Sequence, residues 1–298
     1  MKITITGATG FIGKHLLQTY PPDEHSLIVL GRGKAGFDER IHFSFWDGQA
    51  AEPGKEALEH SDAVIHLAGE TIAQRWTPEA KQRIVNSRSA GTRNLVSAIA
   101  RCRHRPRVLV SASAIGFYGD RGEEVLTESS PPGRGFTAEV CQLWEAEADR
   151  ASEYGVRVVK IRIGVVLGSG GGALQKMTPI FQWGLGGPLG GGNQWMSWIH
   201  VEDLVRIIHR AVADSAIDGV WNGVAPEPVR NRDFTRELAA VLRRPALFPA
   251  PALAMKLILG EMSQMVLSSQ RIHPAAALAA NFQFIHPNLS GALRSILA

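Results

Sequence analysis

Three glycines near the start of the chain have the spacing of a phosphate-binding loop. Gly7-Ala8-Thr9-Gly10-Phe11-Ile12-Gly13 follows a β-branched run at residues 1–6 and precedes an apolar helical stretch at 14–20. A loop of this kind presents backbone N–H groups and the positive end of a helix dipole to a pyrophosphate. Gly7 permits the tight turn, Gly10 lets the phosphates approach the backbone, and Gly13 lets the helix pack on its strand. Because a strand and a helix flank the glycines, the pattern predicts dinucleotide binding rather than an ordinary βα turn.

The end of the next predicted strand indicates which dinucleotide. Residues 26–30 are apolar and lead into Gly31-Arg32-Gly33-Lys34, with no acid at the strand end. An acid there would bind the ribose 2′-hydroxyl of NAD, whereas Arg accommodates the 2′-phosphate of NADP. Arg32 with Lys34 therefore favours NADP(H), the alternative being a solvated turn. Trp46 and Asp47, after a third strand at 41–46, are candidates to flank the adenine, and Trp46 is equally compatible with the core.

Two further strands end in residues that suit a cofactor and its substrate. Residues 62–69 are almost uniformly apolar and end in small residues, followed by Glu70. His66 within this strand is expected to be a hydrogen-bonded core histidine. The strand at 107–111 leads into Ser113, whose hydroxyl, at the carboxyl end of a parallel strand, could bind a substrate oxygen.

These strands alternate with helical segments, as in a parallel sheet covered on both faces. The predicted fold is an α/β, doubly wound parallel sheet (Rossmann) with a small, mostly helical C-terminal lobe. Residues 1–165 are expected to form the dinucleotide-binding domain, completed by 195–225. Residues 166–194 and 226–298 are expected to form the substrate-side lobe and the helical tail. The glycine-rich stretch between 164 and 192 is typical of a lid or pocket wall.

The composition excludes several classes of protein. The 298 residues carry a net charge of +4 with scattered cations, which gives nucleic-acid binding little support. The two cysteines form neither a metal-binding pattern nor a disulfide framework, so no metal site is expected. No apolar run is long enough to span a bilayer, and the chain begins directly with a strand. We expect a cytoplasmic protein that acts on a small-molecule substrate without nucleic acid or membrane. Its oligomeric state does not follow from the sequence.

The chain resembles the extended short-chain dehydrogenase/reductases. The shared motifs, besides the glycine loop, are Asp62-x-Val64-Ile65-His66-Leu67-Ala68, Ser111-x-Ser113 leading to Tyr118-Gly119, Arg162-Ile163-Gly164-Val165-Val166-Leu167-Gly168, and Trp198-Ile199-His200-Val201-Glu202-Asp203. Within that superfamily it is similar to the YfcH-like nucleoside-diphosphate-sugar epimerases, through Arg75-Trp76, Ser87-Arg88-x-x-Gly91-Thr92, Gly219-Val220-Trp221-Asn222-Gly223 and Ser269-Gln270-Arg271. The wider resemblance covers about the first 210 residues, and the narrower one covers nearly the whole chain.

The resemblance implies a redox step with NADP(H) or NAD(H) at a hydroxyl-bearing carbon. The residues expected to contact the cofactor are Gly7, Thr9, Gly10, Phe11, Ile12, Gly13, Arg32, Trp46, Leu67, Ala68, Gly69, Glu70 and Gly164. Such enzymes carry a Ser or Thr, which Ser113 matches, and a Tyr-x-x-x-Lys pair. Thr137 and Cys141 occupy the positions of the Tyr and the Lys, so both the proton donor and its neighbouring cation are missing.

Several groups remain as substitutes for the missing pair. Tyr118 is the phenol nearest to Ser113 in sequence, and packing against the sheet is the alternative role for it. Glu70, Glu139 and Glu145 are acids within reach, and Cys141 has no nearby His to activate it. The sequence therefore leaves two functions open. One is an NADP(H)-dependent oxidoreductase or epimerase with a polar substrate, such as a nucleotide sugar, in which Ser113 and Tyr118 are catalytic. The other is an NADP(H)-binding protein without turnover, a redox sensor or partner-binding module.

Overall fold

The computed structural model describes residues 1–33 and 36–297. Its centre is a seven-stranded sheet in the order β11-β7-β5-β4-β1-β2-β3, in which every neighbouring pair is parallel. The strands of this sheet are β1 (Lys2–Thr6), β2 (Ser26–Gly31), β3 (His42–Phe45), β4 (Ala63–His66), β5 (Val108–Ala114), β7 (Arg157–Ile163) and β11 (Gly219–Gly223). The doubly wound parallel sheet predicted from the alternating pattern is confirmed.

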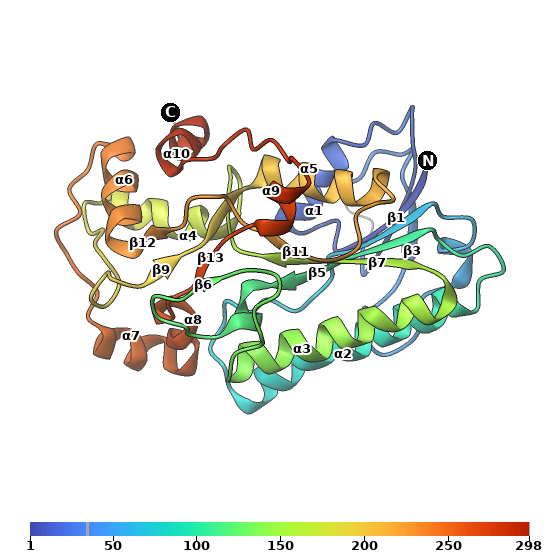
Figure 1. Ribbon diagram of the computed structural model, residues 1–298, viewed down its shortest axis with the longest axis horizontal. Coiled ribbons are helices and arrows are strands. Elements are labelled where there is room, and N and C mark those ends of the chain that lie inside the picture. The colour runs from blue at the N-terminus through green and yellow to red at the C-terminus, as the bar shows by residue number, and fades with distance from the viewer. Residues whose placement is uncertain (34–35, 298) are drawn as a thin grey trace.

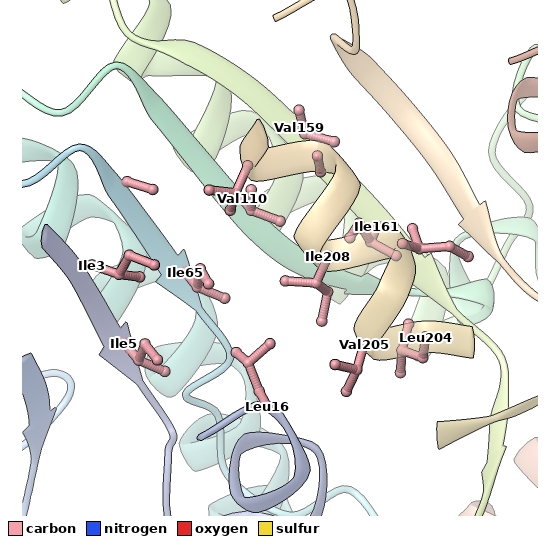
Figure 2. Packing of buried hydrophobic residues seen from close by; sticks show 14 of the residues in the cluster. Ile3, Ile5, Leu16, Ile65, Val110, Val159, Ile161, Leu204, Val205 and Ile208 are labelled. Carbon is pink, nitrogen blue, oxygen red and sulfur yellow. The ribbon is translucent and has the colours of Figure 1, made fainter. Parts of the chain in front are cut away.

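Helices cover both faces of the sheet. Those beside it are α1 (Phe11–Gln18), α2 (Pro78–Ala100), α3 (Phe136–Asp149) and α5 (Val201–Ala213). Figure 1 shows α2 and α3 side by side below the sheet, with α1 and α5 above it. The two layers are separate apolar clusters, one with Leu16 and Ile208, the other with Leu95 and Ala148. Figure 2 shows the first, where strand residues such as Ile5 face α1 and α5.

A smaller lobe, at the left in Figure 1, packs around its own core that includes Trp198 and Phe234. Its short strands are β8 (Val165–Leu167), β9 (Trp195–Met196), β10 (Trp198–His200) and β12 (Val229–Arg230), and its helices are α4 (Gly172–Gln182), α6 (Asn231–Leu242), α7 (Ala252–Leu259), α8 (Ser263–Leu267) and α10 (Leu289–Leu297). Trp198 is fully buried there. Helix α9 (Ala275–Ala279) packs instead on β11 and the core of the main sheet. The helical C-terminal region is therefore present, while the proposed boundaries of the two parts stay a prediction.

The tail holds the loop that follows β5. Strand β13 (Arg271–Ile272) pairs with β6 (Val125–Leu126), and the Gln270 amide donates to the carbonyls of Ile115 and Gly119 at 2.8 and 3.0 Å. A segment 150 residues further along the chain thus fixes the backbone just beyond Ser113. No helix in the described part of the chain is both long and apolar enough to cross a membrane.

Candidate functional site

A groove lies at the carboxyl ends of β1, β2, β3 and β4, where ligands bind in open parallel sheets. The order of the strands reverses here, because β1 has β2 on one side and β4 on the other. The groove holds a cavity of about 200 Å³. Its walls come from four strand ends with the loops that follow them and from one residue within α2: Gly7, Ala8, Thr9, Gly10, Val29, Leu30, Gly31, Arg32, Trp46, Asp47, Gly48, Gln49, Leu67, Ala68, Gly69, Glu70 and Ser87.

The glycine loop is shaped as its sequence predicts. Gly7 has φ +72°, and a Cβ there would stand 2.6 Å from the carbonyl carbon of Leu67. A Cβ on Gly13 would stand 2.4 Å from the Gly7 carbonyl oxygen, so α1 packs closely on the loop only with glycine at this position. Helix α1 begins at Phe11 with Gly10 as its N-cap. Its first N–H groups have no acceptor within the helix and are therefore suited to bind an anion.

Four of the predicted cofactor residues do not line this groove. Phe11 and Ile12 turn their side chains away, Phe11 under the Gly171–Gly172 segment and Ile12 onto the sheet core, so any contact they make is through their N–H groups. Gly13 faces the backbone of Gly7 and Ala8, where α1 packs on the loop. Gly164 lies where β7 passes into β8, and the next residue, Val165, donates its N–H to the Ser197 carbonyl at 2.9 Å. A Cβ on Gly164 would stand 2.7 Å from the Ser197 carbonyl oxygen, so glycine allows this close packing, and the cofactor contact of Gly164 stays a prediction.

The far end of the groove carries positive charge and a fixed carboxylate. Arg32 is exposed there directly after β2, while Lys34 lies outside the described residues. Asp47 accepts the backbone N–H groups of Gln49 and Ala50 at 2.9 and 3.0 Å, and these bonds lower the pKa of its carboxyl. Trp46 both lines the groove and packs in the core, with its indole N–H donated to the Ala51 carbonyl at 2.8 Å.

Gly48 and Gln49 also line the groove, although they are absent from the predicted cofactor residues. The turn signal Asp47-Gly48 at the end of a buried strand was the cue that could have found them. Ser87, in contrast, lies within α2 and enters the groove because its hydroxyl accepts the N–H of Glu70 at 2.9 Å. Such a contact between distant segments leaves no local pattern in the sequence.

The core role expected for His66 is confirmed. Its ring is fully buried between the hydroxyls of Thr6 and Thr92, at 2.7 and 3.0 Å. Burial lowers the pKa of His66 to about 4, with the charge of Arg88 acting in the same direction. The imidazole is therefore neutral near pH 7, and Thr6 in turn accepts the N–H of Ala68 at 3.1 Å, fixing the loop after β4.

Ser113 belongs to a buried polar network beneath the ends of β5 and β7. Its hydroxyl donates to Glu145 Oε1 at 2.6 Å. Arg162 holds the same carboxylate with two bonds, Nε to Oε1 and Nη2 to Oε2, both 2.8 Å long. The side chains of Glu145 and Arg162 are only 7% and 5% exposed. Glu145, on α3, is therefore the acid that tertiary structure brings to Ser113. Among the described residues, neither Glu70 nor Glu139 forms a hydrogen bond with Ser113.

Tyr118 is at the far side of this network. Its side chain is fully buried, its hydroxyl donates to Asn222 Oδ1 at 2.7 Å, and it accepts from Arg162 Nη1 at 3.0 Å. Burial raises the pKa of this phenol, although Arg162 opposes the rise. A phenol enclosed and engaged in this way is poorly placed to protonate a substrate. The burial and hydrogen bonds of Tyr118 accord with the packing role that the sequence left open, and its role as a catalytic acid stays a prediction.

The positions of the missing Tyr and Lys lie on α3 against the Ser113 loop. Thr137 packs on Gly116, and the Cys141 thiol donates to the Ala114 carbonyl at 3.6 Å. Burial raises the pKa of the Cys141 thiol to about 11, so it is neither a nucleophile nor a source of charge near neutral pH. Neither residue supplies what the usual pair supplies.

A cation reaches this region from α2. Arg88 Nη1 donates to the Glu70 carbonyl at 3.0 Å, and a Cβ on Gly69 would stand 3.3 Å from its Cζ. The guanidinium lies over the Trp144 ring of α3, 5.1 Å from the ring centre. Burial lowers its pKa, which nearby Glu70 and Cys141 oppose, yet an Arg side chain stays charged in proteins. Arg88 thus places positive charge between the cofactor groove and Cys141.

Two groups of histidine and glutamate lie outside the groove. They are Glu59 with His60 and His104, and His200 with Glu202 and His286. In the second group His200 Nδ1 accepts the N–H of Glu202 at 3.1 Å, which makes it the N-cap of α5. This capping bond gives His200 a structural role at the start of α5.

Comparison with known proteins identifies the family. Residues 3–222 match the NAD dependent epimerase/dehydratase family, and residues 250–296 match a domain of unknown function, DUF1731. An Arabidopsis thaliana relative, "Epimerase family protein SDR39U1 homolog, chloroplastic", is 44% identical over all of this chain and 87% of its own.

Two solved structures are similar over the whole chain. The human epimerase family protein SDR39U1 (isoform 2), solved with NADPH, has a TM-score of 0.88 and 32% identity, with 99% of its chain covered. The nucleoside-diphosphate sugar epimerase from Corynebacterium glutamicum has a TM-score of 0.82 and 34% identity, with 58% of its chain covered. With the groove, the glycine loop and these matches together, the chain belongs to the NAD-dependent epimerase/dehydratase family of short-chain dehydrogenase/reductases and carries the DUF1731 region at its C-terminal end.

Proposed function

We propose that the protein is an NADP(H)-dependent oxidoreductase or epimerase that acts on a hydroxyl-bearing carbon of a polar small molecule. Arg32 carries the choice of cofactor, because it lines the groove at the end of β2 where an acid would select NAD. The NADPH in the human relative supports this choice. A nucleotide sugar is the substrate class to test first, given the function named for the Corynebacterium relative.

The Ser113 hydroxyl has a defined direction in this site. Because its hydrogen is donated to Glu145, its oxygen is left to accept a hydrogen bond. Ser113 is therefore suited to hold the hydroxyl of an alcohol, while the bound nicotinamide supplies the hydride chemistry. The two bonds from Arg162 keep the Glu145 carboxylate in one orientation, and that orientation fixes the Ser113 oxygen in turn.

Arg88 provides the positive charge that Cys141 lacks. Its Nη1 is used by the Glu70 and Ile84 carbonyls, at 3.0 and 3.3 Å. The guanidinium has further N–H donors, and we assign them to the nicotinamide half of the cofactor, beyond Gly69. A hydrogen bond from a charged group contributes about 1.5–3 kcal/mol, which corresponds to about ten- to a hundredfold in affinity.

Calorimetric titration with three ligands tests the cofactor site as a whole. NADPH should bind tightly and NADH weakly, and adenosine 2′,5′-bisphosphate should bind through the adenine half alone. Arg32→Ala should weaken NADPH and the bisphosphate while leaving NADH nearly unchanged. Equal losses for NADPH and NADH would refute the role of Arg32, and failure of all three ligands to bind would refute the proposed function.

The variant Arg88→Met tests whether Arg88 contacts the nicotinamide half of the cofactor and not the adenine half. It should weaken NADPH about tenfold or more and leave adenosine 2′,5′-bisphosphate unchanged, with Arg88→Lys intermediate. Arg93→Met, on the same helix and paired with Glu147 at the surface, is the matched control. Equal weakening of both ligands by Arg88→Met would show that Arg88 supports the fold of the groove instead.

Cofactor binding without turnover is the second candidate. It is favoured by the burial of Ser113, which is 2% exposed, and by the engagement of Tyr118 within the network. A screen of alcohol and nucleotide-sugar substrates, followed by the absorbance of reduced nicotinamide, distinguishes the two. Tight NADPH binding with no turnover of any substrate class would favour the second candidate.

A further inference from the structure

Apolar side chains are concentrated at one corner of the lobe. Of the fourteen large apolar side chains that are exposed among the described residues, eight lie in three segments, at 180–185, 247–248 and 253–258. Trp183 is 82% exposed, Leu247 75% and Leu257 72%. We call these three segments the apolar corner. Large exposed apolar patches on soluble proteins mark surfaces that bind another molecule.

The three segments are neighbours in space. The N–H of Phe248 donates to the Gly186 carbonyl at 3.2 Å, and the N–H of Gly190 donates to the Ala250 carbonyl at 2.8 Å. The loop after α4 therefore runs beside the segment that leads into α7. In Figure 1, α7 lies at the lower left end of the molecule, away from α1 and the N-terminus.

Helix α7 has no buried face to explain its sequence. Seven of its eight residues are apolar and the eighth is Lys256, yet none of the eight is buried. A helix that is apolar all round is normally enclosed by protein or lipid. Within the described residues nothing encloses it, so its apolar surface is available to a partner.

The three segments of the apolar corner, with the residues that flank them, carry cations and no acid, and Glu261, the first acid after them in the sequence, is paired with Lys81. Residues 170–201 and 238–260 contain no Asp or Glu, while Lys176, Arg243, Arg244 and Lys256 are exposed. In the described part of the chain none of these four cations forms a salt bridge with an acid. Exposed Trp, Phe and Leu next to unpaired cations are the composition of surfaces that lie in the headgroup region of anionic membranes.

We propose that the apolar corner binds the surface of an anionic lipid membrane. Trp183 and Phe248 would sit among the headgroups, α7 would lie in the plane of the interface, and the cations would face lipid phosphates. A second copy of the chain fits less well. In a twofold dimer the patch would face itself and bring Lys256 and its neighbouring cations together without an acid. The absence of a membrane-spanning helix does not bear on a surface of this kind.

Sedimentation with lipid vesicles tests the proposal on the full chain. The protein should pellet with vesicles of phosphatidylcholine mixed with phosphatidylglycerol and remain in solution with phosphatidylcholine alone. The double variant Trp183→Ser/Leu257→Ser should lower the bound fraction about tenfold, because two large apolar side chains no longer enter the interface. Lys256→Glu should raise the amount of anionic lipid required for binding.

Leu143→Ser is the matched control, because Leu143 is a 49% exposed leucine on α3 outside the apolar corner. It should bind vesicles like the unaltered protein, and all variants should keep their melting temperature and NADPH affinity. Failure of the unaltered protein to bind either vesicle would overturn the proposal. So would a concentration-dependent dimer in analytical ultracentrifugation that the double variant abolishes, which would assign the corner to a second copy.

Discussion

The Glu145–Arg162 pair makes a quantitative prediction about how the Ser113 network is held. Glu145→Gln keeps the shape of the side chain but leaves the Arg162 guanidinium, 5% exposed, without its counter-ion. Removing one partner of a buried ion pair costs about 3–5 kcal/mol, because the other charge stays desolvated. For a chain of this size each kcal/mol shifts the melting temperature by about 2–4 °C, so the variant should melt roughly 10 °C lower.

Thermal unfolding followed by circular dichroism, without cofactor, measures this difference. Glu147→Gln is the control on the same helix, because the partner of Glu147, Arg93, is 54% exposed. Pairs of that kind contribute about 0–1 kcal/mol. Glu145→Leu combined with Arg162→Met should recover most of the lost stability, since no unpaired charge then remains buried. A fall for Glu145→Gln no larger than that for Glu147→Gln would refute the reasoning.

Three further predictions concern Ser113, Gly13 and His66. Ser113→Ala should abolish turnover of any substrate found while NADPH affinity, measured by calorimetry, is kept; unaltered turnover would leave Ser113 with a structural role only. Gly13→Ala should destabilise the fold by about 1–3 kcal/mol in urea unfolding and weaken NADPH, because its Cβ would meet the Gly7 carbonyl oxygen at 2.4 Å. Gly191→Ala, at an exposed position outside the groove where the Cβ would meet only Asn193 Nδ2 at 3.7 Å, should do neither, and equal effects would contradict the packing argument. The folded-state pKa of His66, about 4, lies below the ordinary value of about 6.5, so its stabilisation is present above pH ~6.5 and is lost as pH falls towards 4, by about 3 kcal/mol in all. His66→Gln should flatten the pH dependence of urea unfolding in this range, and an unchanged slope would show that His66 does not titrate there.

The fold and the cofactor groove followed from the sequence because their signals are local. The turn at Gly7 and the close packing at Gly13 are required by residues only a few positions away, apart from the approach of Leu67 to Gly7. Apolar strands alternating with helices predict a parallel sheet with helices on both faces, and this is the architecture observed. The approach of Ser197 to Gly164, by contrast, joins segments far apart in sequence, and the cofactor contact assigned to Gly164 from its motif stays a prediction.

The groups around Ser113 depended on tertiary structure. Ser113 and Glu145 are 32 residues apart, Glu145 and Arg162 are 17 apart, and Tyr118 and Asn222 are 104 apart. No periodicity links such residues, since their contacts form only when α3, β5, β7 and β11 pack together. The sequence alone determined that the chain has a phosphate-binding glycine loop and a parallel sheet. It also determined that the Tyr-x-x-x-Lys pair is missing. Only the packing of α2 and α3 under the strand ends decided that Glu145 holds Ser113 and that Arg88 brings its charge beside Cys141, and only the pairing of β7 with β11 enclosed Tyr118 between Arg162 and Asn222. Hydrogen bonds and burial depend on distance in space and not on distance along the chain.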